Sequence, residues 1–346
     1  METSDNCRRA EGVGVSYHPF LHDTLLNCRD LFDFVELPLD LYVDPARAAL
    51  LDPGQHRLRQ ILDAKRCVWR GSALSLGTVG PDDDAGFSPH TLRRIRTLLD
   101  MIEAEPYADI IGFRAAEFGP LQAMPFTTQA AHWIAIRQAA AQDALGVPVR
   151  LCLPGPVSDT RRSELDVADF LNSIVAHGGS GVVLDATDLS AADLGSDAAR
   201  DLAARLPAAH IEALSVSGTG GHGWETLRTL ADHIRPATVI LRRDRQLFPL
   251  DTIETDIACA GELVARPAHQ PPPAAVVPPQ PANSADLAAL RLYQSAPAPD
   301  EASRDLREVA GQSWQNWRTQ VDDLHKAQQI MALMSKGANP PAAWRG

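Results

Sequence analysis

Short apolar runs alternate with amphipathic stretches over most of the chain, and this alternation predicts the fold. The runs that predict strands lie at residues 12–17, 34–40, 67–75, 109–115, 149–153, 181–185, 210–216 and 237–242. The stretches that predict helices lie at residues 21–28, 57–63, 88–101, 127–145, 164–176, 193–206, 223–234 and 251–264. Nearly continuous apolar strands are typical of a parallel sheet that is buried on both faces. Eight strand–helix units over roughly 250 residues predict an α/β fold, a (β/α)8 TIM barrel.

An open, doubly wound sheet would also alternate strands with helices, but it usually has fewer strands. The turn after the first predicted strand reads Ser16-Tyr-His-Pro19 and lacks the GxGxxG pattern of dinucleotide-binding sheets. The barrel is therefore the preferred interpretation.

The pattern divides the chain into four parts. Residues 1–11 are an N-terminal extension, residues 12–265 form the barrel, residues 266–284 form a proline-rich linker and residues 285–346 form a helical tail. Closely spaced prolines favour an extended, stiff conformation, which is why the linker separates the barrel from the tail.

The tail carries apolar side chains at alternating steps of three and four residues, with one gap of seven. They are Ala310, Trp314, Trp317, Val321, Leu324, Met331 and Met334. This spacing places them on one face of a helix, which a lone helix cannot bury. The simpler interpretation is a terminal helix docked on its own barrel. The alternative is partner recognition by Trp314, Trp317, Val321, Leu324 and Met331, with a second copy or a protein or peptide partner.

Composition and charge exclude several classes of function. The net charge of −12 argues against a general binder of nucleic acid or anionic membranes, because the field of the protein repels phosphate. No apolar run is long enough to span a bilayer, and the first residues lack the apolar core of a signal peptide. The five cysteines contain no CxxC pair, so they predict neither a disulfide framework nor a zinc site. We expect a cytoplasmic protein.

In a TIM barrel, chemistry takes place at the C-terminal ends of the strands. The polar residues at these predicted ends are Glu36, Asp40, Arg70, Arg114, Glu117, Cys152, Asp185, Asp188, Ser215, Ser217, Arg242 and Asp244. Side chains alternate in direction along a strand, so an inward Cys152 would also turn Arg150 into the lower barrel. Burial of that charge is costly, and we therefore expect the fifth strand to turn Cys152 outward as an inert thiol.

Five segments carry a resemblance to a known family. They are Gly12-Val-Gly-Val-Ser-Tyr-His-Pro19, Phe34-Val-Glu-Leu-Pro-Leu-Asp-Leu-Tyr42, Arg70-Gly-Ser-Ala-Leu-Ser-Leu-Gly77, Asp143-Ala-Leu-Gly-Val-Pro148 and Val182-Val-Leu-Asp-Ala-Thr-Asp188. In order and spacing, these segments resemble the multinuclear non-heme iron-dependent oxidative enzymes, the MbnB-like family, across residues 12–264. The resemblance implies a TIM barrel that holds two or three irons through inward His, Asp and Glu. It also implies oxidation of cysteines in ribosomally made peptides with dioxygen.

The same resemblance implies that most of the iron ligands are missing from this chain. The histidines of the third, fourth and seventh strands fall at Arg70, Arg114 and Leu214. The glutamates of the fifth and eighth strands fall at Cys152 and Arg242. Asp185 stands at a ligand position, and His222 is a candidate second ligand. Arginine stays protonated and cannot coordinate ferrous iron, so we expect no bound metal.

Loss of the metals alone would leave Glu36, Asp40 and Asp185 repelling one another. Arg70, Arg114 and Arg242 would supply fixed cations in place of the metals, so we expect an arginine–carboxylate network in the upper barrel. This leads to a metal-free, noncatalytic barrel that binds a peptide or protein partner, with no catalytic residue assigned.

Two alternatives keep other chemistry open. One is an iron-dependent oxidative enzyme whose reduced site would use Asp185, Asp188, Glu36, Asp40 and either His18 or His222. The other is a barrel that binds an anionic small molecule at the glycine-rich loop after the seventh strand, through Gly218, Gly220, Gly221 and His222. These glycines equally suit a tight loop with no ligand, and His222 equally suits an ordinary loop position.

Overall fold

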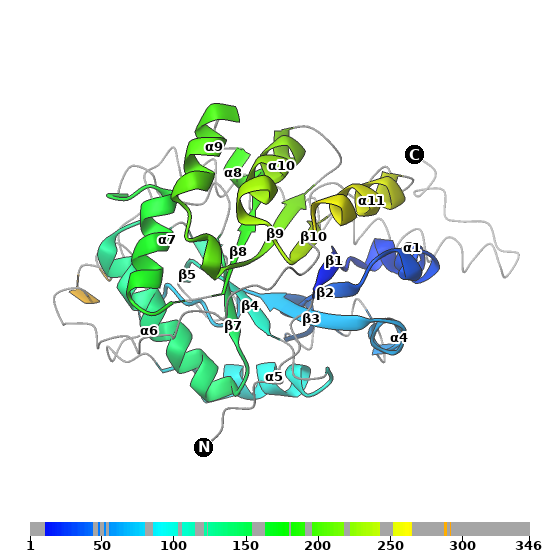
Figure 1. Cartoon of the computed structure of the whole chain (residues 1–346). Coiled ribbons are helices and arrows are strands. Elements are labelled where there is room, and N and C mark those ends of the chain that lie inside the picture. The colour runs from blue at the N-terminus through cyan, green and yellow to red at the C-terminus, as the bar shows by residue number, and fades with distance from the viewer. Residues whose placement is uncertain are drawn as a thin grey trace, which may run out of the picture. The chain divides into compact units, whose positions relative to one another are not determined.

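The barrel predicted from the apolar runs is present in the computed structural model (Figure 1). The structure describes residues 11–43, 48, 52, 55–79, 86–102, 106–114, 121–122, 124–153, 163–179, 181–190, 196–217, 222–242, 252–264, 287–288 and 291. The barrel strands are β1 (Gly12–Ser16), β2 (Phe34–Pro38), β3 (Arg66–Gly71), β4 (Tyr107–Ile110), β7 (Val149–Cys152), β8 (Val182–Asp185), β9 (Ile211–Ser217) and β10 (Thr238–Arg242). All neighbouring pairs are parallel, and β10 pairs with β1 to close the barrel.

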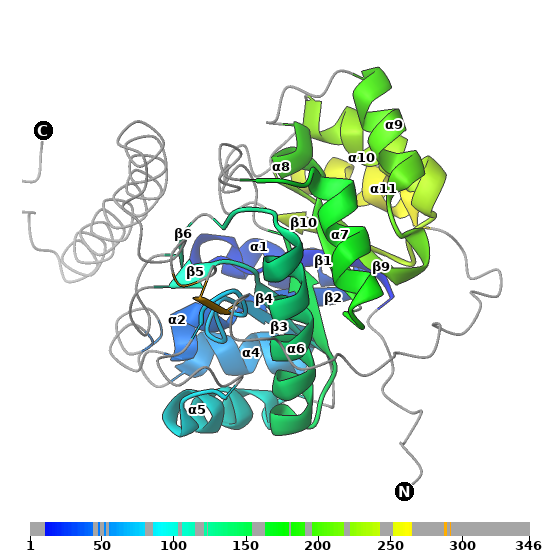
Figure 2. The ribbon, with the colours of Figure 1, turned by 90° about the vertical axis from the view of Figure 1, so that its left-hand side faces the viewer.

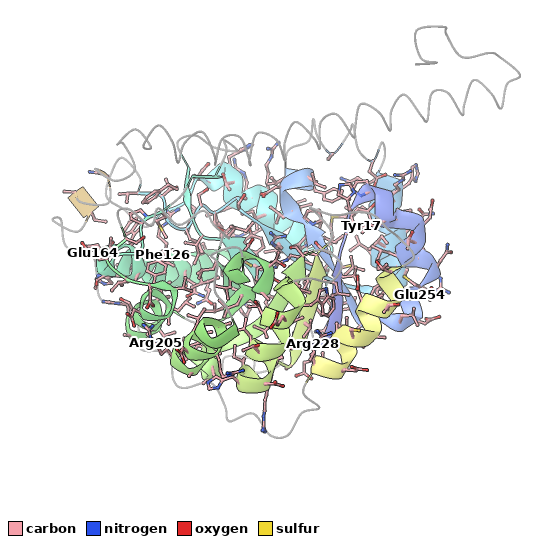
Figure 3. The ribbon with its side chains drawn as sticks, turned by 90° about the horizontal axis from the view of Figure 1, so that it is seen from above. Tyr17, Phe126, Glu164, Arg205, Arg228 and Glu254 are labelled. Atoms are coloured by element: carbon pink, nitrogen blue, oxygen red, sulfur yellow. The ribbon has the colours of Figure 1, made fainter. Side chains whose placement is uncertain are left out.

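An outer layer of helices surrounds these strands (Figures 1 and 2). The helices are α1 (His22–Asn27), α2 (Leu39–Val43), α4 (His56–Ala64), α5 (Pro89–Leu99), α6 (Thr128–Leu145), α7 (Val167–Ala176), α8 (Ala186–Ser190), α9 (Ser196–Arg205), α10 (His222–Ile234) and α11 (Ile253–Leu263). Seen from above, Arg205 of α9 and Glu254 of α11 lie at the periphery of the molecule (Figure 3). No helix in this described part of the chain has the length and apolar character that a bilayer span requires.

Local sequence signals fix several helix ends. Ser88 caps α5 by accepting a hydrogen bond from the backbone N–H of Thr91, and Pro89 occupies the first helical position. Thr127 caps α6 in the same way, and Gly146 ends that helix with a φ of 73°. A left-handed residue at this position favours glycine, which explains why the helix pattern stops there.

Two predicted strands end earlier than expected. The predicted strand at 67–75 ends at Gly71, because the next backbone N–H groups bond to side chains instead of a neighbouring strand: Ser72 donates to Asp40 and Leu74 donates to Asp109. The predicted strand at 109–115 was placed too late. The barrel strand β4 covers Tyr107–Ile110, and β5 (Phe113–Arg114) pairs with β6 (Leu121–Gln122) in a separate antiparallel ribbon.

The lower interior of the barrel is apolar. The inward residues that form this cluster are Phe34, Val68, Ala108, Cys152, Val183, Ala213 and Ile240. Gly14 leaves room for the ring of Phe34, because a Cβ at Gly14 would lie 2.3 Å from Cζ of that ring. A larger cluster fills the space between the outer faces of the strands and the helices, and Leu287, only 5% exposed, belongs to it.

Several predicted features lie outside the described residues. They are the N-terminal extension up to residue 10, the proline-rich linker at 266–284, and the tail residues Trp314, Trp317, Val321, Leu324 and Met331. Leu287, near the start of the predicted tail, is buried in the outer apolar cluster of the barrel.

Candidate functional site

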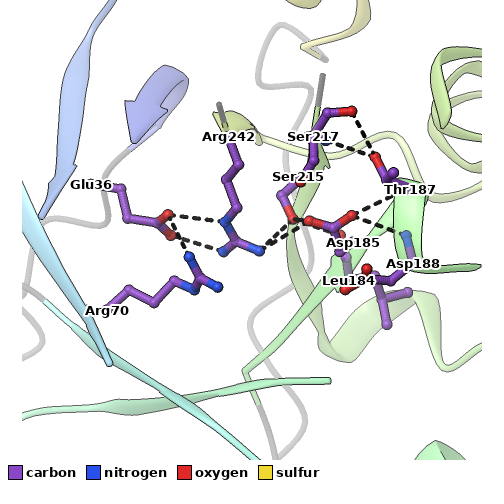
Figure 4. Close-up of polar contacts among 9 residues, drawn as sticks. All are labelled: Glu36, Arg70, Leu184, Asp185, Thr187, Asp188, Ser215, Ser217 and Arg242. Carbon is purple, nitrogen blue, oxygen red and sulfur yellow. Dashed lines mark hydrogen bonds and ion pairs between the residues drawn. The ribbon is translucent and has the colours of Figure 1, made fainter. Parts of the chain in front are cut away.

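Four charged side chains from four different strands meet in the upper half of the barrel, above the apolar cluster. Glu36 comes from β2, Arg70 from β3, Asp185 from the end of β8 and Arg242 from the end of β10. Figure 4 shows the guanidinium of Arg242 between the carboxylates of Glu36 and Asp185. The network therefore joins strands that lie on opposite sides of the barrel.

Arg242 is the centre of this network. Its Nε and Nη2 donate to the two carboxylate oxygens of Glu36 at 3.0 and 2.9 Å, which is a bidentate pair. Its Nη1 donates to Oγ of Ser215 at 2.7 Å and to Asp185 at 3.3 Å. The side chain of Arg242 is 4% exposed and that of Glu36 is 2% exposed, so the pair is dry. A buried guanidinium with all three nitrogens engaged is fixed in place.

Asp185 is oriented by the helix that follows it. One carboxylate oxygen accepts hydrogen bonds from the backbone N–H groups of Thr187 and Asp188 at 3.0 and 3.2 Å, at the start of α8. The other oxygen accepts from Oγ of Ser215 at 2.9 Å. Two backbone N–H groups and one hydroxyl group thus stabilise the negative charge of Asp185, in addition to the contact with Arg242.

Arg70 occupies the outer edge of the network. Its Nη1 lies 3.7 Å from Oε2 of Glu36, an ion-pair distance beyond hydrogen-bond range. Its side chain is 20% exposed, against 2–4% for the other three members. Arg70 is therefore the member that solvent reaches.

The arginines also set the ionisation of their neighbours. Burial disfavours the charged form of Glu36, but the positive charges of Arg242 and Arg70 outweigh it and lower the pKa of Glu36. Burial likewise disfavours the charged form of Arg242, but the charge of Glu36 raises the pKa of Arg242 well above its usual value. The carboxylate and the guanidinium are both charged at neutral pH.

The expectation for the fifth barrel strand is wrong, because Cys152 points inward. It belongs to the interior apolar cluster, and burial raises the pKa of its thiol. Arg150, two residues earlier, is consequently buried as well, and its Nε donates to a carboxylate oxygen of Glu212 at 2.7 Å. The expectation assumed that burial of Arg150 would be costly, but the carboxylate of Glu212 offsets its charge.

Glu212 was missed in the sequence because β9 is irregular there. Val182 pairs with Ile211 and Val183 pairs with Ala213, so Glu212 is the extra residue of a β-bulge. Simple alternation cannot assign a direction to a bulged residue. The inward Arg150 was the available signal, because a buried arginine demands a carboxylate partner.

The remaining candidates lie apart from the network or outside the described residues. Asp40 lies in α2, where its carboxylate accepts hydrogen bonds from the backbone N–H and Oγ of Ser72. Asp188 lies in α8 and contributes its N–H to Asp185. Arg114 is in β5, outside the barrel sheet, and its side chain lies outside the described set, as does the side chain of His222. Gly218, Gly220 and Gly221 are also outside it.

The residues that the structure brings together do not fit an iron centre. Both oxygens of Glu36 are bound to one guanidinium, and both oxygens of Asp185 accept hydrogen bonds. The cation of Arg242 occupies the space between the two carboxylates, and a protonated guanidinium has no lone pair to give. Among the described residues, no group of three or more His, Cys, Asp or Glu side chains is arranged to hold a metal ion.

Comparison with known proteins identifies the family. Residues 12–265 match the model of the RiPP precursor modification enzymes MbnB/TglH/ChrH, whose substrates are ribosomally made peptides. This match covers most of the chain, and the chain belongs to that family.

Solved structures with a similar fold include L-ribulose 3-epimerase, with 16% identity over 73% of this chain and 92% of that protein and a TM-score of 0.41. They also include 3-keto-D-glucoside 4-epimerase YcjR from E. coli, with 10% identity, coverage of 72% and 98%, and a TM-score of 0.46. D-psicose 3-epimerase from Clostridium cellulolyticum H10 has 13% identity, coverage of 82% and 98%, and a TM-score of 0.39. Likeness at this level carries no information about the reaction.

Proposed function

We propose that this member of the RiPP precursor modification family is a metal-free, noncatalytic barrel that binds a peptide or protein partner. The observation that carries the proposal is the position of Arg242. A fixed cation satisfies Glu36 on both oxygens and also contacts Asp185, which leaves these carboxylates without the geometry or the charge to attract a metal ion.

We infer that the charged network around Arg242 stabilises the folded barrel, whereas a metal centre at the same place would carry out a reaction. Two buried carboxylates would repel each other, and Arg242 offsets their charge with hydrogen bonds to both. The same contacts leave no carboxylate of the network available as a general base, because Arg242 lowers the pKa of Glu36 and holds its lone pairs. Cys152 is a buried thiol whose pKa is raised by burial, which makes it a poor nucleophile.

Family membership suggests the class of molecule that the barrel binds. Its members act on ribosomally made precursor peptides, so a peptide or a protein that presents one is the partner we propose for this barrel. The apolar stripe of the tail, with Trp314 and Trp317, remains a sequence-based proposal for contact with a protein partner or a second copy.

The alternative function is iron-dependent oxidation of cysteines in a ribosomally made peptide, and family membership is the observation that favours it. It would require the guanidinium of Arg242 to leave both carboxylates, because the oxygens of Glu36 and Asp185 that would coordinate iron already accept hydrogen bonds from it. Separating Arg242 from Glu36 and Asp185 would leave one buried cation and two buried anions without their partners. The cost would be several kcal/mol, on the order of the penalty for breaking a buried ion pair.

Affinity-selection mass spectrometry tests the proposal. The protein is incubated with a pool of short cysteine-containing peptides, ferrous iron and dioxygen. The masses of the retained peptides and of all peptides in the mixture are then measured. We expect some peptides to be retained and none to change in mass. Retention of no peptide would overturn the binding role. A mass change that requires the protein and iron, and that is lost in Asp185→Ala, would overturn the noncatalytic role.

A further inference from the structure

One apolar side chain that follows the last barrel helix at a long distance in sequence is buried against the barrel. Helix α11 ends at Leu263, yet Leu287 is only 5% exposed and belongs to the apolar cluster between the strands and the outer helices. The next residue, Ala288, is also helical but exposed. The chain divides into two compact units, and the first extends to Ser295, so this segment belongs with the barrel. Leu287 is therefore a point at which the segment is held to the barrel.

This segment, which we call the strap, is described at Leu287, Ala288 and Arg291. In Figure 1 the strand β3 runs leftward from α4, so the parallel strands end on the left; the strap, in orange, lies on that side and α11, in yellow, on the right. Figure 2, seen from that side, shows the strap in front of the barrel and near β5 and β6. The strap thus lies at the C-terminal face, which carries the site in TIM barrels.

The contact made by Leu287 is suited to reversible docking. Burial of one leucine stabilises the docked strap, but fixing the backbone of a few residues costs conformational entropy of a similar size. The place that Leu287 occupies is apolar and close to solvent, since Ala288 beside it is exposed. When Leu287 leaves, apolar atoms of the cluster become exposed to water, and an apolar side chain of another molecule gains stabilisation by covering them.

We propose that the strap is an autoinhibitory segment. Docked through Leu287, it occupies an apolar place at the C-terminal face that the partner of this barrel fills with an apolar side chain of its own. This inference rests on the proposed function and adds its regulation. Because the strap belongs to the same chain, its effective concentration is high and a partner must compete with it. The apparent affinity for the partner then falls in proportion to the fraction of molecules in which the strap is open.

Fluorescence anisotropy with a labelled synthetic peptide of residues 283–294 of this chain tests whether the place can be vacated and refilled. The proteins are the wild type, Leu287→Asp and, as the matched control, Ala288→Asp, which adds the same charge at the exposed neighbouring position. We expect the peptide to bind Leu287→Asp at least about tenfold more tightly than the other two proteins, because only this variant leaves the place vacant. The same peptide carrying Leu287→Asp should bind none of them.

The affinity selection with the pool of cysteine-containing peptides, repeated without iron, tests the autoinhibitory role. Leu287→Asp should retain at least about threefold more peptide than Ala288→Asp, because its C-terminal face is open in a larger fraction of molecules. Leu287→Ala removes most of the apolar contact without adding a charge. Compared with the wild type in both measurements, it covers the case in which Leu287→Asp does not fold.

Two results would overturn the inference. In the first, the peptide of residues 283–294 binds Leu287→Asp no more tightly than it binds Ala288→Asp, so Leu287 holds no place that another chain can fill. In the second, the two variants retain equal amounts of the peptide pool, so the strap does not compete with a partner. Failure of the proposed function gives a different pattern: no protein retains any peptide of the pool, while the peptide of residues 283–294 still binds Leu287→Asp.

Discussion

Among the described residues, two buried arginines, Arg150 and Arg242, come from strands and lie inside the barrel at opposite ends, and their surroundings differ in a way that separates stability from function. Near the N-terminal end, Arg150 makes a simple pair with Glu212, whose side chain is 21% exposed. At the C-terminal end, Arg242 bonds to two carboxylates and a serine and is almost completely dry. In TIM barrels the first end contributes stability and the second carries the site.

The comparison shows what a buried charge needs at each end of the barrel. One carboxylate is enough to offset Arg150, because water can reach Glu212. Arg242 makes the bidentate contact with Glu36, the bond to Ser215 and the contact with Asp185, and its side chain is only 4% exposed, so protein groups and not solvent offset its charge. The upper network is therefore the more demanding structure, and its loss should be the more costly.

The largest expected effect is the loss of Arg242. We expect Arg242→Ala to lower the free energy of unfolding by about 3–5 kcal/mol, because it leaves two buried carboxylates without their cation. Arg150→Ala, the matched control, should cost about 1–3 kcal/mol, since Glu212 can be hydrated. Urea denaturation measures both. An equal or larger loss for Arg150→Ala would contradict the distinction between the two ends.

The next effect concerns the apolar layer between the two arginines. A Cβ at Gly14 would lie 2.3 Å from the ring of Phe34, so Gly14→Ala should lower the free energy of unfolding by about 1–3 kcal/mol through overpacking. Gly261→Ala is the control, because its added Cβ would meet Val13 at an ordinary 3.9 Å. Adding Phe34→Leu should recover part of the loss in Gly14→Ala; no recovery would show that the ring is not the cause.

A third effect appears in the pH dependence of stability. The pKa of Glu36 is lower in the folded protein than in the unfolded chain, so its contribution is present above the unfolded value and is lost as pH falls through the folded value. Glu36→Gln should flatten the acid-side slope of the unfolding free energy by up to about 1.4 kcal/mol per pH unit below roughly pH 4.3.

Asp166 provides the comparison for this slope at the surface. Burial opposes its ionisation, but hydrogen bonds from Asp169 and Arg205 lower its pKa, and the side chains of Asp166 and Arg205 are about half exposed. The slope change in Asp166→Asn should shrink in high salt, because solvent ions screen exposed pairs. The slope change in Glu36→Gln should persist. Guanidinium chloride is itself a salt, so urea titrations at several pH values are the suitable measurement.

The smallest expected effect is that of Ser215→Ala. Its hydroxyl donates to Asp185 and accepts from Arg242, so removal should cost about 0.5–1.5 kcal/mol of unfolding free energy, the value of ordinary hydrogen bonds. Thermal and urea denaturation both report it. A loss as large as that of Arg242→Ala would mean that Ser215, and not the guanidinium, holds the network together.

The alternation of apolar runs with amphipathic stretches predicted the barrel, because its parallel strands are apolar runs and several of its helices carry their own cap or stop signals. Gly146 and Ser88 are examples of signals that act locally and can be read locally. The end of β3 could not be predicted in this way, because side chains distant in sequence, Asp40 and Asp109, accept hydrogen bonds from the backbone N–H groups that follow β3.

The charged network could be predicted because Glu36, Arg70, Asp185 and Arg242 stand at predicted strand ends and the family resemblance places Arg70 and Arg242 at former metal-ligand positions. The Arg150–Glu212 pair was not, because it depends on the direction of β7 and on a bulge in β9. Asp40 was expected in the network beside Glu36 and Asp185, but Pro38 ends β2 and the chain enters α2 at Leu39. The alternation of side chains along a strand no longer predicts their direction where the strand ends or bulges.

Metal content is the measurement that tests the central claim most directly. The protein is purified without oxygen, supplied with ferrous iron, desalted and analysed by mass spectrometry, with Asp185→Ala treated in parallel. The account predicts less than about a tenth of an equivalent of bound iron in both proteins, because Arg242 holds the carboxylates that a metal would need. One or more equivalents in the wild type, lost in Asp185→Ala, would contradict it and assign an iron centre to the upper barrel.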